Sequence, residues 1–95
     1  MYGSIFNLKP KKGKKEELIN YLKNNEEKPD GGVAWYVLDP DNNGDLVAIA
    51  IFKDKESYIA NAGRPEQHEN FMKMMEFLDK EPTWNDGNFV IGENL

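Results

Sequence analysis

One apolar segment, DLVAIAIF at residues 45–52, limits what this chain can fold into more than any other part of the sequence. Side chains along a β-strand alternate between the two faces of the sheet. The even-numbered residues of this segment therefore share one face, and Val47, Ile49 and Ile51 share the other. A strand that is apolar on both sides is expected to be covered on both. Because 95 residues supply helices for one face only, we expect a second copy of the chain to cover the other.

Length and composition limit the class of protein. Residues 1–95 are enough for one domain with its own core. Hydrophobic residues make up 39% and charged residues 31% of the chain, a mixture typical of soluble domains. The absence of cysteine excludes disulfides, thiolate nucleophiles and cysteine-ligated metal sites. No segment resembles a leader or approaches the roughly 20 apolar residues of a membrane span, so we expect a cytoplasmic protein with no membrane partner.

The charge of the chain is uneven. The net charge of −5 disfavours nucleic acid as a partner of the whole domain. Five of the seven residues from Lys9 to Lys15 are nevertheless lysines. This cluster could bind a phosphate or a polyanion, but a solvated turn between a strand and a helix also needs polar residues. We interpret the cluster as a solvated turn.

Hydrophobic periodicity and turn residues predict the order strand, helix, strand, strand, helix, strand. Asp54 is a candidate N-cap, and the second helix is broken in two at Gly63-Pro65. This order indicates an α+β, ferredoxin-like βαββαβ fold, with helices on one face of a four-stranded antiparallel sheet. The predicted strands are residues 1–8, 33–38, 45–52 and 88–92, and the predicted helices are residues 14–25, 55–62 and 65–80.

The connection between the second and third strands contains Asn43-Gly44, a pair that suits the positive φ angles of tight turns. Asp39 and Asp41 also match the ligand spacing of a calcium loop. However, Ala50 stands where the closing bidentate glutamate belongs, and strands flank the loop. We therefore predict a hairpin turn and no metal site.

The pairing of these two strands decides which side chains would face a second copy. If Leu38 pairs with Leu46, Tyr36 lies opposite Ala48 and Ala34 opposite Ala50, on a face with room beneath the helices. The other face is then dense with large apolar side chains. The predicted dimer interface consists of Val33, Trp35, Val37, Val47, Ile49 and Ile51.

Short motifs in a fixed order cover nearly the whole chain. They are KGK at residues 12–14, GG at 31–32, FKDKESY at 52–58, RPEQHENF at 64–71 and EPTWNDG at 81–87. As a set they resemble the antibiotic biosynthesis monooxygenase-like (ABM) domains of the dimeric α+β barrel superfamily. The resemblance implies a homodimer that meets through helix-free sheet faces, with a ligand pocket between sheet and helices in each subunit.

Two residues are candidates for catalysis under this resemblance. His68 could act as a general base or an axial haem ligand, because it borders the apolar stripe of its predicted helix. It could equally be a partly buried histidine with a passive hydrogen bond. Asn7 is similar to the strand asparagine of haem-degrading relatives. Phe52 departs from the tryptophan that some oxygenase relatives carry, and we expect no cofactor.

An aromatic set could line a pocket for a flat apolar ligand, although the same residues could simply be core. Arg64 could hold an acidic group of the ligand or pair with a nearby carboxylate. The candidate ligand-binding residues are Tyr36, Phe52, Tyr58, Arg64 and Phe71.

Two functions follow from the resemblance and these residues. One is a cofactor-independent monooxygenase that acts on a small aromatic or polyketide-like molecule. The other is a non-catalytic homodimer that binds a small ligand or serves a stress response. A cavity of roughly 300 Å³ or more with His68 on its wall would favour the enzyme.

Overall fold

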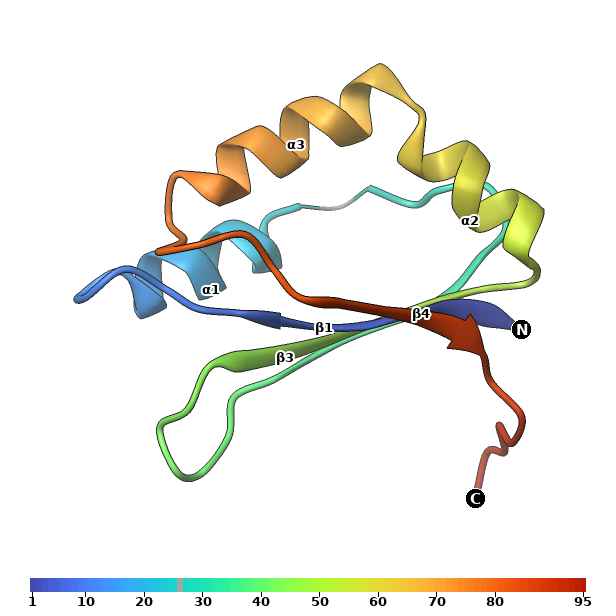
Figure 1. Cartoon of the computed structure of the whole chain (residues 1–95), viewed down its shortest axis with the longest axis horizontal. Coiled ribbons are helices and arrows are strands. Elements are labelled where there is room, and N and C mark those ends of the chain that lie inside the picture. The colour runs from blue at the N-terminus through green and yellow to red at the C-terminus, as the bar shows by residue number, and fades with distance from the viewer. Residues whose placement is uncertain (26) are drawn as a thin grey trace.

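Four strands form one antiparallel sheet, and three helices cover one of its faces (Figure 1). The computed structural model describes residues 1–25 and 27–95. The elements are β1 (Tyr2–Leu8), α1 (Lys15–Lys23), β2 (Gly32–Leu38), β3 (Leu46–Phe52), α2 (Lys55–Ala62), α3 (Pro65–Met75) and β4 (Trp84–Asn88). The strand order is β2-β3-β1-β4. The predicted ferredoxin-like α+β fold, with its second helix in two pieces, is confirmed.

The centre of the core lies between the middle strands and α1. Leu8 of β1 pairs with Leu46 of β3, and both are fully buried in one cluster with Leu18 of α1. Burying each leucine contributes about 1.5–3 kcal/mol, so this cluster holds α1 against the sheet. The helix itself is favoured by Glu16 and Glu17 in its first turn, where the helix dipole stabilises negative charge.

The corner between α2 and α3 forms as predicted. The Asp54 carboxylate accepts a hydrogen bond of 2.8 Å from the backbone N–H of Ser57 and so caps α2. Gly63 ends α2, and Pro65 occupies the first turn of α3, where its missing N–H costs nothing. From this corner α3 runs back along the sheet (Figure 1). Within the described residues no helix is both long enough and apolar enough to cross a membrane.

The third helix ends earlier than the apolar pattern predicts. It stops at Met75, not near residue 80, and a turn follows. The backbone N–H of Lys11 donates to the Phe77 carbonyl at 2.8 Å, which ties this turn to the connection before α1. Because the helix has ended, Phe77 packs beside Tyr21 with ring centroids 5.5 Å apart and does not point into solvent.

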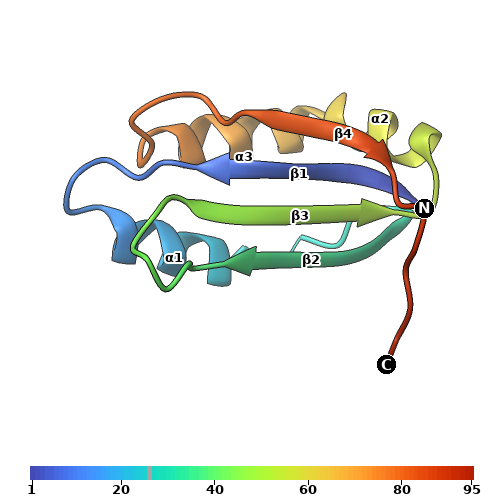
Figure 2. The same cartoon turned by 60° about the horizontal axis from the view of Figure 1, so that its bottom comes forward.

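The last strand also lies earlier than predicted. It is Trp84–Asn88, not residues 88–92, and its first residue pairs with Phe6 at a ring-centroid distance of 4.3 Å. The more apolar residues that follow leave the sheet as a tail (Figure 2). Val90 and Ile91 in this tail are 91% and 79% exposed. The aromatic pairing at Trp84, and not the aliphatic run, sets the position of the strand.

The second strand pairs with β3 one residue away from the predicted register. Leu38 lies opposite Val47 and not Leu46, and a bulge interrupts the pairing between Gly32 and Ala34. A shift of one residue moves every side chain of a strand to the other face of the sheet. The predicted faces of β2 are therefore exchanged.

Small and large side chains explain the observed register. Trp35 lies opposite Ala50, and Val37 lies opposite Ala48, on the face that the helices cover. The ring centroids of Trp35 and Phe6 are 6.0 Å apart on that face. The two alanines leave space that the larger β2 side chains occupy. The prediction that Trp35 and Val37 form the dimer interface is therefore wrong.

Figure 2 shows the face of the sheet that no helix covers, and several large apolar side chains are exposed on it. Val47, Ile49 and Ile51 of β3 lie on it, because the alternate residues of β3 belong to the core beneath the helices. From β2 this face carries Tyr36 and Leu38, which are 62% and 60% exposed. Val33, another predicted interface residue, is exposed at the bulge. We call the surface formed by these side chains the open face.

Candidate functional site

A pocket of about 380 Å³ opens between α1 and the β2 side of the sheet. Its volume is near the lower end of the range for small-molecule sites, roughly 300–1,000 Å³. It exceeds the volume that we expect a ligand to need. The residues that line this α1–β2 pocket are Ile19, Leu22, Lys23, Asn25, Trp35, Val37, Asp39 and Leu46.

Trp35 is the aromatic wall of the pocket. The observed register of β2 turns its indole toward the helices, and 47% of the residue is still exposed. Ile19 and Leu22 of α1 and Val37 of β2 complete an apolar lining. An indole with a free surface beside aliphatic side chains suits a flat apolar molecule.

The polar groups of the pocket lie on the last turn of α1, just after it, and at the end of β2. Asp39 forms an ion pair with Lys15 of α1, with Lys15 Nζ and Asp39 Oδ1 2.5 Å apart. Lys23 and Asn25 add an ammonium and an amide. Within the described part of the chain, neither side chain forms a hydrogen bond or ion pair with another residue.

The two predicted catalytic residues are not at this pocket. His68 lies on the exposed side of α3 and is not among the lining residues, so the prediction that its ring faces the sheet is wrong. Asn7 pairs with Val47 and points to the open face. Its side-chain oxygen accepts a hydrogen bond of 2.8 Å from the backbone N–H of Thr83, which connects β1 to the approach of β4.

A haem does not fit the residues of the α1–β2 pocket. The lining contains no histidine and no other usual axial ligand, since Lys23, Asn25 and Asp39 are its polar groups. Among the described residues, no group of three histidine, aspartate or glutamate side chains comes together to hold a metal ion.

The predicted aromatic ligand set is also dispersed. Tyr36 is on the open face, away from the helices. Phe52 is buried against Tyr58 in an edge-to-face contact of 5.6 Å, and Phe71 is half-buried against the core. None of these four lines the α1–β2 pocket. The alternative that these residues belong to the core holds for Phe52 and Phe71.

Tyr58 lies away from the α1–β2 pocket, in a cluster of polar side chains at the α2 end of the sheet. Its hydroxyl donates to the Asp86 carboxylate at 3.0 Å. Burial of the phenol, together with the negative charge and hydrogen bond of Asp86, raises the pKa of Tyr58 to about 12. Ser4, opposite Asp86 in the sheet, places a buried hydroxyl on the same side. The phenol therefore stays protonated at neutral pH.

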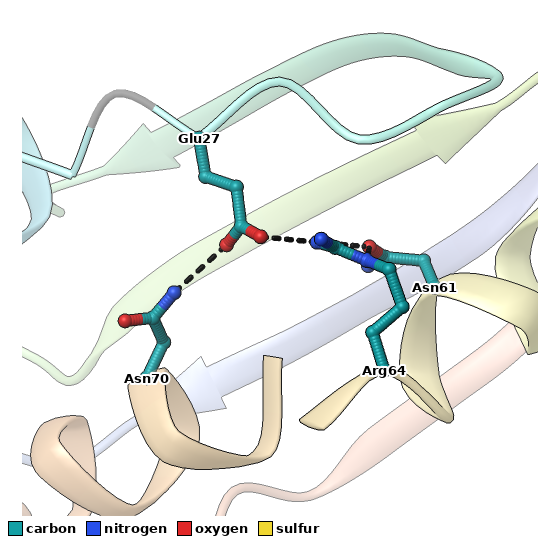
Figure 3. Close-up of polar contacts among 4 residues, drawn as sticks. All are labelled: Glu27, Asn61, Arg64 and Asn70. Atoms are coloured by element: carbon teal, nitrogen blue, oxygen red, sulfur yellow. Dashed lines mark hydrogen bonds and ion pairs between the residues drawn. The ribbon is translucent and has the colours of Figure 1, made fainter. Parts of the chain in front are cut away.

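Arg64 pairs with a carboxylate, which is one of the two roles expected for it. Its guanidinium forms an ion pair with Glu27 and donates to the Asn61 side chain at 3.0 and 2.8 Å. Asn70 of α3 donates to the other oxygen of Glu27 at 2.8 Å (Figure 3). These contacts fasten the connection between α1 and β2 to the α2–α3 corner.

The sequence interpretation overlooked the α1 side of the pocket. Ile19, Leu22 and Asn25 fall on one side of the helical wheel, and the sequence pattern assigns all of that side to the core. In the structure only Leu18 of α1 is fully buried, and its neighbours are half-buried or exposed. The width of the apolar stripe is the signal that could have revealed a second use for this helix.

No protein-family model matches the chain, and no curated protein matches its sequence. Several solved structures are similar in fold. A conserved protein from Methanosarcina mazei Go1 has a TM-score of 0.78 and 23% identity over 90% of this chain and 89% of its own. Rv0793 from Mycobacterium tuberculosis has a TM-score of 0.80 and 14% identity over 98% of each chain.

A third similar structure connects the fold with a named group of proteins. It is a "Putative antibiotic biosynthesis monooxygenase" from Nitrosomonas europaea, with a TM-score of 0.79 and 14% identity over 96% of this chain and 100% of its own. At this level of identity the likeness establishes the fold and not the activity. The chain therefore has the ferredoxin-like α+β fold of the ABM-like proteins, as its sequence motifs imply.

Proposed function

We propose that this protein binds a small, flat, apolar molecule in the α1–β2 pocket and does so as a homodimer without catalysing a reaction. The observation that carries the proposal is the half-exposed indole of Trp35 beside the aliphatic side chains that line a pocket of about 380 Å³. Such a combination of volume and apolar lining is typical of small-molecule sites.

The placement of the titratable groups supports binding over oxygenation. Activating a phenolic substrate toward oxygen needs a base within hydrogen-bond reach of the substrate. His68 and Asn7 lie elsewhere, and the one carboxylate in the pocket, Asp39, is paired with Lys15. The pocket therefore offers no residue in the role of general base that a monooxygenase would need. The cytoplasmic location expected from the sequence stays a prediction.

The dimer part of the proposal rests on the open face. Large apolar side chains there are exposed in a single protomer, and a patch of this kind usually marks an interaction surface. A second copy offers a matching surface through two-fold symmetry. The α1–β2 pocket lies on the opposite, helix-covered side, so pairing through the open face leaves the pocket accessible.

Trp35 fluorescence tests the binding proposal directly. The chain has two tryptophans, so a Trp84→Phe background makes Trp35 the only one. Titration with 2-naphthol should change its emission with saturation, and Trp35→Ala should abolish binding measured by calorimetry. Ile59→Ala is the matched control, because it removes a similarly exposed apolar side chain outside the pocket.

An oxygen electrode separates binding from catalysis in the same samples. Saturable binding without oxygen consumption supports the proposal. Oxygen consumption that depends on 2-naphthol would show an enzyme, and binding that Trp35→Ala leaves unchanged would show that the ligand sits elsewhere.

A further inference from the structure

The charges around the α1–β2 pocket indicate what kind of ligand it takes. We infer that the pocket selects aromatic carboxylates, with the aromatic body against Trp35 and the carboxylate at Lys23 and Asn25. This inference rests on the proposed binding function and adds the chemical class of the ligand.

The negative charge in the pocket is already compensated. Lys15 Nζ is 2.5 Å from Asp39 Oδ1, and the Lys15 side chain is only 29% exposed. Asp39 is therefore not free to attract a cationic ligand. The ion pair also bridges α1 and the end of β2, so it fixes two walls of the pocket relative to each other.

Among residues 1–25 and 27–95, the positive charge in the pocket has no such partner. Within the described part of the chain, Lys23 pairs with no carboxylate. Two carbonyls near the end of α1 already accept backbone hydrogen bonds: the Asn24 N–H donates to Asn20 O at 3.1 Å, and the Asn25 N–H donates to Leu22 O at 3.3 Å. The pocket thus offers a ligand the Lys23 ammonium and the Asn25 amide as hydrogen-bond donors, beside the indole N–H of Trp35, and of these only the Lys23 group carries a positive charge.

The distribution of polar and apolar groups fits one shape of ligand. Lys23 is the last residue of α1 and Asn25 lies two residues beyond it, while Trp35, Val37 and Ile19 belong to the aliphatic and aromatic part of the lining. A molecule with a flat ring system and an anionic group at one end matches this separation. A volume near the lower end of the usual range suits one or two fused rings.

Calorimetry with a matched pair of probes tests the inference. The probes are 2-naphthoate and 2-naphthamide, which share a ring system and differ in charge. The wild-type protein should bind 2-naphthoate more tightly by roughly fivefold, because a partly exposed charge pair contributes at most a modest free energy. Added salt should reduce this preference.

Three variants separate charge from packing. Lys23→Met keeps the length of the side chain and should remove the preference for 2-naphthoate, so that the two probes bind with similar affinity. Lys12→Met removes an exposed lysine outside the pocket and should change neither affinity. Asp39→Asn should preserve or increase the preference, because it leaves the pocket more positive.

Each result has a distinct meaning. Equal binding of both probes to the wild-type protein overturns the ligand class but leaves the binding function intact. Loss of both probes in Lys23→Met shows that Lys23 acts through packing and overturns its role in charge recognition. Failure of the wild-type protein to bind either probe, with a native circular dichroism spectrum, overturns the proposed function together with this inference.

Discussion

Tyr58 shows how one side chain couples the charge state of the protein to its stability. Its pKa is raised from an ordinary 10.0 to about 12 by burial and by Asp86. Between these values the unfolded chain loses the phenolic proton while the folded protein keeps it, so the unfolded state binds fewer protons. Stability should therefore fall as pH rises from 10 to about 12.

Urea unfolding at pH 8, 10 and 11.5 checks this prediction. Tyr58→Phe, which retains the ring, should show a smaller loss of stability over that interval than the wild-type protein. Tyr36→Phe is the control, because Tyr36 is exposed and its hydroxyl makes no hydrogen bond among the described residues. An identical loss in Tyr58→Phe and the wild-type protein would contradict the prediction.

Single residues also show where sequence reasoning about the site fails. His68 borders the apolar stripe of its helix, and a small rotation of the helix decides whether such a residue is covered or exposed. Here it is exposed. Arg64 needed only a carboxylate within reach, and Glu27, 37 positions earlier, supplies it. Such long-range proximity depends on tertiary packing and is not encoded in local spacing.

At the scale of elements, the sequence predicted the N-cap of α2 and the break before α3, but not the end of α3, the position of β4 or the pairing of β2. The Asp54 cap and the Pro65 start are properties of neighbouring residues, and both formed as predicted. The register of β2 depends instead on which side chains of two strands complement one another. A loop of several residues permits more than one alignment, and one step exchanges the two faces. The main wall of the pocket, Trp35, was therefore assigned to the wrong surface.

The small size of Ala48 is what permits the observed register, and enlarging it should be costly. Ala48 is fully buried opposite Val37 and close to the pocket. Ala48→Val should lower the free energy of unfolding by about 1–3 kcal/mol, because extra methyl groups overpack the core. Ala60→Val on the exposed side of α2 should cost less than about 0.7 kcal/mol, the range of helix propensity. Urea midpoints measure both, and equal costs would contradict the explanation of the register.

At the scale of the whole molecule, the open face should control assembly. Ile49 lies at its centre, between Ile5 of β1 and Tyr36 of β2. Ile49→Asp should convert the protein to a monomer in sedimentation velocity, because a buried charge without a partner is strongly unfavourable. Ile59→Asp on α2 should leave the dimer intact. A wild-type protein that sediments as a monomer at every concentration would refute the homodimer.

The tail after β4 gives the final prediction about assembly. It leaves the sheet on the helix-free side (Figure 1). Val90 and Ile91 in this tail are exposed. Neither side chain stabilises the protomer, so replacing both should not change its thermal midpoint at low concentration. In a dimer formed through the open face, we expect these side chains to contact the partner, because the tail extends on the same side of the sheet. Burial of each contributes up to about 1.5–3 kcal/mol, so Val90→Asp with Ile91→Asp should raise the dimer dissociation constant at least roughly tenfold.

Asn94→Asp adds charge to the tail without removing an apolar group and serves as the control. An unchanged dissociation constant in the double variant would show that the tail lies outside the interface.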